Sequence, residues 1–328
     1  MTKKYLITGF GIIGLLGCVT AQASCGSTSC SINTNWDEHG MSHPGWMADL
    51  RYSYSRANKL RSGSNKIAAD TAFAGEVENL STVNKIVTAT VDYTHDEHWG
   101  VMLHLPYITR DHDHNLGPYD AATPAGYESF HASALSDIKV VGRYRWALDE
   151  TSRSGMGVKF GLKLNTGKKD FTIAQTGEKP GEATLQPGNG STDLIAGAFW
   201  SQSTPGSDWN WFAQGTVQSS ISSDTAFRPG NQINLDAGTR HALSHNLSAL
   251  LQLNAQWNGA DSGDSAALTP SGAASSGGRI ISLTPGLSYA FTPDTQVYGL
   301  VQLPIYQYVN GEQLTANSSM TVGVSHRF

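Results

Sequence analysis

Beyond its first 23 residues, the sequence lacks any apolar run approaching the roughly 18–20 residues that a membrane-spanning helix needs. It also lacks a basic excess, since 22 lysines and arginines are outnumbered by 27 aspartates and glutamates. The first absence excludes a helical membrane protein, and the second argues against a nucleic-acid partner. A transmembrane β-barrel is compatible with both, because every second residue of its strands faces a polar interior.

Cysteine is scarce, with three in 328 residues. Cys18 belongs to the apolar leader, which leaves Cys25 and Cys30 as the pair in the mature chain. In an oxidising exported compartment we expect these two residues to form a small disulfide loop. The alternative is a metal site shared with His39 and His43, although the spacing matches no reliable zinc pattern.

The N-terminus predicts export. A basic start (MTKK), an apolar core (YLITGFGIIGLLG) and a small-residue site (AQA) follow one another as in a cleavable signal peptide over residues 1–23. The alternatives are an uncleaved anchor helix and lipid attachment at Cys18 within LLGC. Cleavage removes Lys3 and Lys4 and leaves 20 basic and 27 acidic residues, a net charge of −7.

From residue 46 onward, apolar and polar residues alternate in stretches of about ten, the period of a strand with two different faces. In LSALLQLNAQW, Leu251 and Leu253 share one face, Gln252 and Asn254 share the other, and Leu250 alone breaks the pattern. Twelve such stretches are present, at 46–56, 82–94, 98–108, 136–148, 155–166, 191–203, 208–219, 232–243, 247–258, 279–291, 295–306 and 316–328.

Short and long connections alternate between these stretches. The long ones are 57–81, 109–135, 167–190, 220–231, 259–278 and 307–315. Outer-membrane barrels have short periplasmic turns and longer extracellular loops, and an even number of strands. We therefore predict an all-β fold, a transmembrane antiparallel barrel of about twelve strands over residues 46–328. A periplasmic segment over 24–45 carries the cysteine pair.

One run of the sequence, LSDIKVVGRYRW…GVKFGLKLNTGKKDF…QPGNGSTDLIAGAFW, resembles the outer-membrane barrels grouped with the meta-cleavage pathway of phenol degradation. These proteins commonly show a G-D-x-x-[VL]-x-x-[KR]-Y strand and an L-K-L-P-T-G strand end. Here Ser136 replaces the first glycine and Asn165 replaces the proline. The resemblance spans 46–328 and implies a barrel that takes up small solutes, aromatic ones among them. It transfers no catalytic residue.

The alternation also predicts a charged inner face. If Val140 and Tyr144 face lipid, Lys139 and Arg143 point inward; a lysine or arginine facing lipid at mid-depth would cost about 2–4 kcal/mol. The candidate solute pathway consists of Lys139, Arg143, Arg145, Lys159 and Lys163 together with Asp49, Asp92, Asp193 and Asp236. A basic ladder would attract anions, whereas the alternative is a salt-bridged interior that fills the barrel.

The segment RDHDHN (110–115) is expected in the first long loop, after a strand that carries His104. With His112 and His114, this histidine forms a candidate site for a borderline metal such as Cu²⁺ or Zn²⁺. The alternatives are an Asp–His general base and an ordinary solvated loop.

The chain ends in an alternating strand, TVGVSHRF, that closes on Phe328. We expect this terminal aromatic residue to be an assembly signal for the outer-membrane insertion machinery. The expected function is passive passage of small solutes across a bacterial outer membrane. The rival is an occluded barrel that binds Cu or Zn or has a structural or binding role. The partners expected are outer-membrane lipid, the assembly machinery and a small-molecule solute, and neither an enzymatic activity nor a cofactor is expected.

Overall fold

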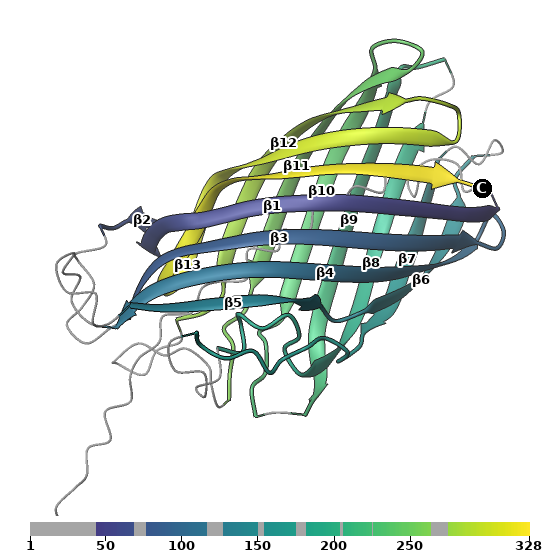
Figure 1. The fold of residues 1–328 in the computed structure, drawn as a ribbon. Helices are drawn as coiled ribbons and strands as arrows, with labels where there is room; N and C mark the ends of the chain where they lie inside the picture. The colour runs from purple at the N-terminus through teal and green to yellow at the C-terminus, as the bar shows by residue number, and fades with distance from the viewer. Residues whose placement is uncertain are drawn as a thin grey trace, which may run out of the picture.

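The computed structural model describes residues 44–68, 77–116, 127–149, 154–174, 182–203, 206–224, 226–263 and 275–328. The predicted signal peptide and the Cys25–Cys30 pair lie outside the described residues. Within them, no helix has the length and hydropathy to cross a membrane. The described chain is built from antiparallel strands that close into a barrel (Figure 1).

The strands are β1 (Gly45–Gly63), β2 (Asn65–Lys66), β3 (Val77–Thr94), β4 (Trp99–Leu116), β5 (Tyr127–Leu135), β6 (Lys139–Ala147), β7 (Gly155–Lys163), β8 (Ser191–Ser203), β9 (Trp209–Ser223), β10 (Gln232–Ala242), β11 (Leu247–Asn258), β12 (Gly278–Ala290) and β13 (Thr295–Arg327).

The first and last strands close the ring. Met47 on β1 pairs with Arg327 on β13, and Tyr54 pairs with Met320. Next to this ladder, the backbone N–H of Phe328 donates to the carbonyl of Trp46 (N···O 2.9 Å). Purple β1 and yellow β13 accordingly run side by side in Figure 1. The terminal strands therefore have no free edge, which is what an alternating strand at the end of the chain requires.

The number of crossings agrees with the sequence. Eleven labelled strands form the ring, while β2 and β5 lie off it. β13 crosses the wall twice, because residues 296–309 pair with β12 and residues 312–327 pair with β1. The chain reverses at Gly311, whose φ of 61° suits glycine. The wall therefore has about twelve crossings, and the connection expected at 307–315 is a tight turn instead of a long loop.

The wall beside β4 is shared by two strands. Residues 99–104 of β4 pair with β6, and residues 107–115 pair with β5. Residues 136–138 interrupt the two strands, and the Asp137 side chain there turns inward and accepts a hydrogen bond from the N–H of Gly167 (2.9 Å). The strand expected at 136–148 is thus β6, which begins after a break at residues 136–138. On the other side of the break, β5 pairs with the remainder of β4.

The RDHDHN segment is strand, contrary to the loop that the sequence predicts. β4 continues to Leu116 and is paired on both sides, with β3 from Val77 and with β5. His112 is fully buried on the inner face, whereas Asp111 is 42% exposed on the outer face. The period of two therefore persists, but both faces are polar here, so hydrophobicity does not reveal it.

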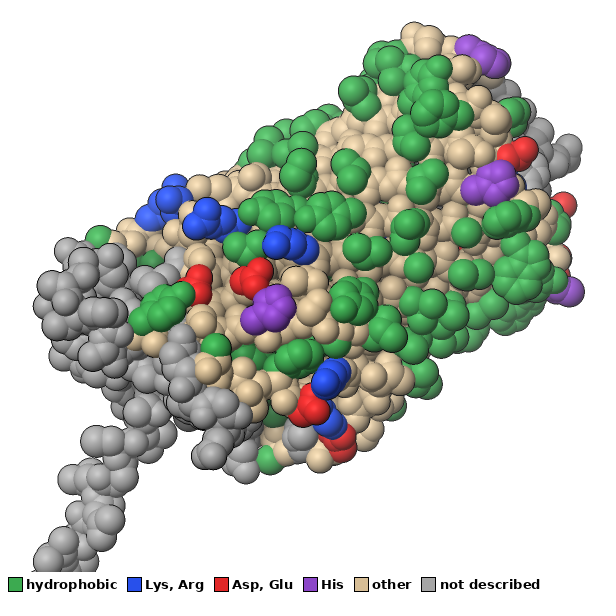
Figure 2. Space-filling model, viewed as in Figure 1, with side chains coloured by type: hydrophobic (Ala, Val, Ile, Leu, Met, Phe, Trp, Pro, Cys, Tyr) green, Lys and Arg blue, Asp and Glu red, His purple; other side chains and the backbone are tan. Residues whose placement is uncertain are grey.

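The outer face is apolar across the middle of the wall, and charged side chains lie toward the ends (Figure 2). Leu251 and Leu253 on β11 are 44% and 47% exposed, whereas Gln252 between them is 1% exposed. Toward the loop end, Lys85 lies 3.8 Å from Asp111, which also contacts His131 (2.6 Å). Such exposure of leucine is favourable only against hydrocarbon, so this surface is suited to the bilayer core.

Aromatic rings cluster at the end of the wall with the short turns. Tyr144 packs edge-on against Trp99 (4.7 Å between ring centroids) and Trp146 (4.8 Å), and Tyr289 packs against Phe291 (5.1 Å). Amphipathic rings prefer the membrane–water interface. This girdle marks the periplasmic boundary of the apolar band.

Candidate functional site: the barrel interior

The inner face carries the charges. The buried charged residues on it, each no more than 8% exposed, include Asp49, Asp92, Arg110, Asp137, Arg143, Arg145, Lys159, Lys163, Asp193 and Asp236. Lys139 is partly buried and lines the same interior. Every residue of the predicted solute pathway is therefore on the inner face. A role for these residues in solute passage stays a prediction.

Arg143 is held by a carboxylate two strands away. Its guanidinium donates to both oxygens of Asp92 (2.6 and 2.9 Å) and to the hydroxyl of Thr94 (2.6 Å). The side chain crosses β4 at Gly100, where a Cβ atom would lie 2.5 Å from Arg143 Cζ. Both charges are about 95% buried, so each depends on the other for compensation.

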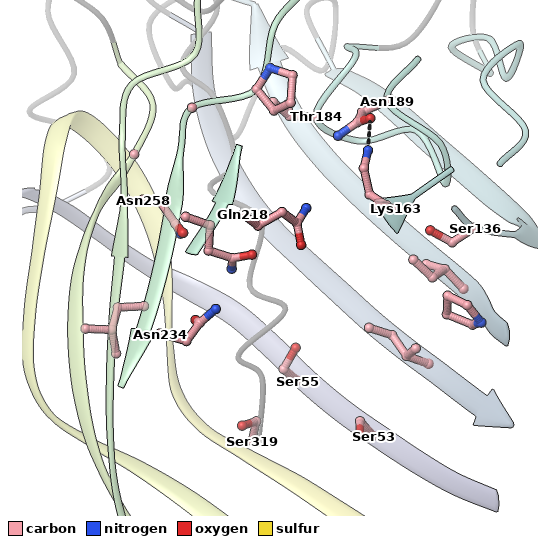
Figure 3. Close-up of a pocket in the computed structure, with 18 of the residues that line it drawn as sticks. Ser53, Ser55, Ser136, Lys163, Thr184, Asn189, Gln218, Asn234, Asn258 and Ser319 are labelled. Atoms are coloured by element: carbon pink, nitrogen blue, oxygen red, sulfur yellow. Dashed lines mark hydrogen bonds between the residues drawn. The ribbon is translucent and has the colours of Figure 1, made fainter. Parts of the chain in front are cut away.

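Lys163 is also paired with carboxylates. Its ammonium group donates to Asp137 (3.0 Å), lies 3.3 Å from Asp193, and donates to Asn189 (2.6 Å) and Ser191 (2.9 Å). Figure 3 shows the Lys163–Asn189 bond at the upper side of the interior. Two of the five basic residues thus support the salt-bridged interpretation of the inner face.

Lys139 and Lys159 are bound differently. The ammonium group of Lys139 donates to Gln218 (3.0 Å), whose amide donates to Asp193 (2.6 Å). In the same way, Lys159 donates to Gln214 (3.0 Å), and Gln214 donates to Asp236 (2.8 Å). An amide group therefore stands between each of these lysines and a carboxylate. Because a neutral partner binds an ammonium group less strongly than a carboxylate does, the hydrogen bond between Lys139 and Gln218 is weaker than an ion pair with a carboxylate would be.

Large side chains fill the periplasmic half of the interior, and we call this set the floor: Arg143, Arg145, Phe199, Phe212, Leu250, Tyr298 and Leu300, each between 1% and 5% exposed. The ring of Phe199 lies over Gly157 and that of Phe212 lies over Gly238, where an added Cβ atom would come within 2.4 and 2.6 Å of the ring. Glycine on a neighbouring strand thus makes room for each ring.

A polar contact and an apolar cluster complete the floor. The hydroxyl of Tyr298 donates to Asp49 (2.8 Å), and Leu250, Tyr298 and Leu300 form one buried cluster. The odd Leu250 in the alternation of its strand was the signal for this cluster. The alternation assigns the two phenylalanines to the inner face, but it gives no sign that their rings pack into a floor.

Above the floor is a cavity of about 530 Å³. Ser53 and Ser55 on β1 face Gln218 and Asn234, on β9 and β10, across it (Figure 3). At its rim, burial raises the pKa of Asp261, in the loop after β11, despite the hydrogen bond that this carboxylate accepts from the N–H of Gly230 (2.8 Å). The cavity therefore lies on the long-loop side of the floor, and the floor narrows the interior at the periplasmic end.

The histidines of the candidate metal site do not converge. His104 and His112 are eight residues apart on β4, or roughly 25 Å, and each bonds a threonine of β3, Thr90 (3.0 Å) and Thr82 (2.9 Å) respectively. The side chain of His114 lies outside the described residues. Among the residues that are described, no group of three metal-binding side chains is found. An Asp–His contact does form, between Asp111 and His131 on the outer wall (2.6 Å).

Phe328, the predicted assembly signal, is at the periplasmic rim. It is 76% exposed and its ring packs edge-on against His326 (4.6 Å between centroids). This position is compatible with recognition of the chain end during assembly, which stays a prediction.

The chain is similar, to different degrees, to three solved structures. An outer-membrane channel from Pseudomonas putida F1 has a TM-score of 0.66 and 12% sequence identity, over 89% of this chain and 98% of that chain. The transport unit of the autotransporter AIDA-I from Escherichia coli has a TM-score of 0.48 and 10% identity, over 90% and 93% of the two chains. The translocator domain of the autotransporter NalP from Neisseria meningitidis has a TM-score of 0.47 and 11% identity, over 89% and 91%.

None of the curated proteins compared matches the chain. At 12% identity, the likeness to the Pseudomonas channel establishes the fold, an outer-membrane β-barrel. Residues 58–328, most of the chain, match a family described as "Putative MetA-pathway of phenol degradation". The chain therefore belongs to this family, as the motifs of β6 to β8 predict.

Proposed function

We propose that this protein passes small solutes across the bacterial outer membrane through the interior of its barrel. The observation that carries the proposal is the cavity of about 530 Å³, lined by charged, polar and apolar side chains, inside a wall whose outer face is apolar. Polar side chains that line this cavity from lipid-facing strands, such as Gln218 and Asn234, can be solvated only from within. The name of the Pseudomonas protein, an outer-membrane channel, agrees with this function.

The solutes proposed are small and anionic or aromatic. Lys139 and Lys159, held by amides, supply positive charge to the cavity. The family description, with its reference to phenol degradation, supports aromatic solutes. No catalysis is part of the proposal, because the Asp111–His131 pair lies on the outer wall and away from the cavity.

The floor favours one rival, an occluded barrel with a binding or structural role. Phe212, Leu250 and Leu300 are 2–3% exposed and narrow the interior where a solute would have to leave. Under the proposed function these side chains move aside as solute passes. If the barrel is occluded, these side chains stay in place.

Solute flux into proteoliposomes distinguishes the two. The purified full-length protein is reconstituted, and swelling is recorded by light scattering after dilution into isotonic sodium benzoate, sodium acetate or a disaccharide. Passage predicts swelling in the small solutes and little in the disaccharide, with none for protein denatured before reconstitution. An absence of swelling in every solute, from protein that still migrates as a folded barrel, would favour the occluded barrel.

A further inference from the structure

An apolar strip crosses the inner face of the cavity between two charged rows. Met102 on β4, Val141 on β6 and Ile195 on β8 form one buried cluster, 3–7% exposed, and all three line the cavity. Other apolar side chains, such as Ile108 and Leu314, also line the cavity, but this cluster lies directly between rows of charged side chains.

The register explains how the three side chains meet. Met102 pairs with Val141, Val141 pairs with Gly161 on β7, and Gly161 pairs with Ile195. Gly161 has no side chain to separate its neighbours, and a Cβ atom there would lie 2.3 Å from the carbonyl of Val140. The glycine therefore lets Val141 and Ile195 touch across an intervening strand.

Cations border the strip on both sides. Two residues nearer the loops, Lys139 pairs with Lys163, and two residues nearer the floor, Arg143 pairs with Lys159. Inward-facing rows are about 7 Å apart along a strand, on the scale of one aromatic ring. Of these cations, Lys139 and Lys159 are bonded to amides, as described above.

We propose that this strip and Lys139 form a binding subsite for a small carboxylate with a ring-sized apolar body. The apolar body packs on Met102, Val141 and Ile195, and the carboxylate replaces Gln218 as the partner of Lys139. The released amide remains hydrogen-bonded to Asp193. The inference rests on the proposed function, since it assigns that pathway a preferred solute class.

Both halves of the site are needed for recognition. A charge-assisted hydrogen bond is about twice as strong as a neutral one, and apolar contact adds affinity in proportion to buried area. An anion without the ring lacks the second contribution, and a neutral ring lacks the first. The site thus predicts selectivity for molecules that carry both features.

Calorimetric titration of the full-length protein in lipid nanodiscs tests this with three probes: benzoate, benzyl alcohol (the ring without the charge) and acetate (the charge without the ring). Benzoate should bind about tenfold more tightly than either of the others. Lys139→Gln should weaken benzoate about tenfold and leave benzyl alcohol unchanged. Val141→Thr, which is nearly isosteric, should weaken benzoate and benzyl alcohol but not acetate.

Lys85→Gln is the matched control, since it removes the same charge from the outer wall and should change no affinity. If a variant does not fold, the wild type alone still tests the proposal: rising chloride should compete with benzoate and not with benzyl alcohol. Equal affinities for benzoate and benzyl alcohol, both insensitive to chloride, would overturn the subsite.

The swelling assay and the benzoate titration together distinguish failure of this inference from failure of the proposed function. Swelling without saturable benzoate binding overturns the subsite and leaves the pathway in place. Saturable benzoate binding that requires Lys139, in a protein that passes no solute, supports the subsite and contradicts the pathway.

Discussion

Arg143 and Lys139 lie on the same strand but have different hydrogen-bond partners. These partners determine whether each side chain acts as part of an ion pair. Arg143 forms a bidentate pair with Asp92 at the floor, where both groups are about 95% buried. Lys139, four residues away on β6, is partly buried and bonds the amide of Gln218. The first is a structural ion pair, and the second is the charge that, under the proposed function, meets a solute.

Replacing each with glutamine should therefore lower the stability of the barrel to very different extents. Arg143→Gln leaves Asp92 buried without its compensating charge and should lower the free energy of unfolding by about 3–5 kcal/mol. Lys139→Gln should have a much smaller effect on stability. Urea titrations of the two folded variants, followed by heat-modifiable migration on gels, measure this difference. Equal losses would mean that the arginine is not a structural ion pair.

The floor offers a second test at the residue scale. Leu250→Ala removes one side of the Leu250–Tyr298–Leu300 cluster and should widen the narrow end, raising single-channel conductance. The lost packing should destabilise the barrel by about 2–5 kcal/mol. Leu253→Ala, on the lipid-facing side of the same strand, is the matched control and should leave conductance as in the wild type. A conductance that is unchanged in both variants would place the narrowest point elsewhere.

Among the elements, β4 shows where sequence patterns lose information. Within the membrane its outward residues are apolar, so the alternation was readable and the strand was predicted. Above the membrane, Asp111 and Asp113 face outward and Arg110 and His112 face inward, so all four are polar. Hydrogen bonding to β3 and β5, and not hydrophobicity, sustains the strand there. The pairing of Lys139 with Gln218 was similarly unreadable, because it links side chains on β6 and β9, which are not neighbouring strands.

The extended β4 predicts an alternating accessibility pattern. In a background with Cys25 and Cys30 changed to serine, Asp111→Cys should react with a membrane-impermeant maleimide on intact cells. His112→Cys should be protected, because that side chain is fully buried. Labelling yields are measured by mass spectrometry of the purified protein. Comparable labelling at both positions would indicate the loop that the sequence alone suggested.

The end of β13 should matter for assembly. Phe328 contributes a backbone hydrogen bond to Trp46 and an exposed ring at the periplasmic rim. Deleting it should lower the amount of heat-modifiable barrel in outer-membrane fractions and leave unfolded protein in the periplasm, whereas Phe328→Trp should assemble normally. Normal barrel levels in the deletion would show that the terminal aromatic residue is not part of the assembly signal.

At the scale of the whole molecule, the sequence predicted the architecture and the charges that face inward, but not how the interior is filled. Alternation and the order of short and long connections were enough for a closed ring of about twelve crossings, because lipid on one side and water on the other impose a period of two. The floor was not predictable, since the room for the rings of Phe199 and Phe212 comes from glycines on neighbouring strands, whose register the sequence does not show. The central claim, that this interior is a route for solutes, depends on that part.

The most direct test of this claim is single-channel current through a variant with one thiol in the cavity. Ser53→Cys, in the background without Cys25 and Cys30, places the thiol on the cavity wall, and Leu251→Cys places it toward lipid. If solutes pass through the interior, both variants should carry current, and a bulky charged methanethiosulfonate should reduce it only in Ser53→Cys. A folded protein that passes no current, or a current that modification at Ser53→Cys leaves unchanged, would contradict the claim.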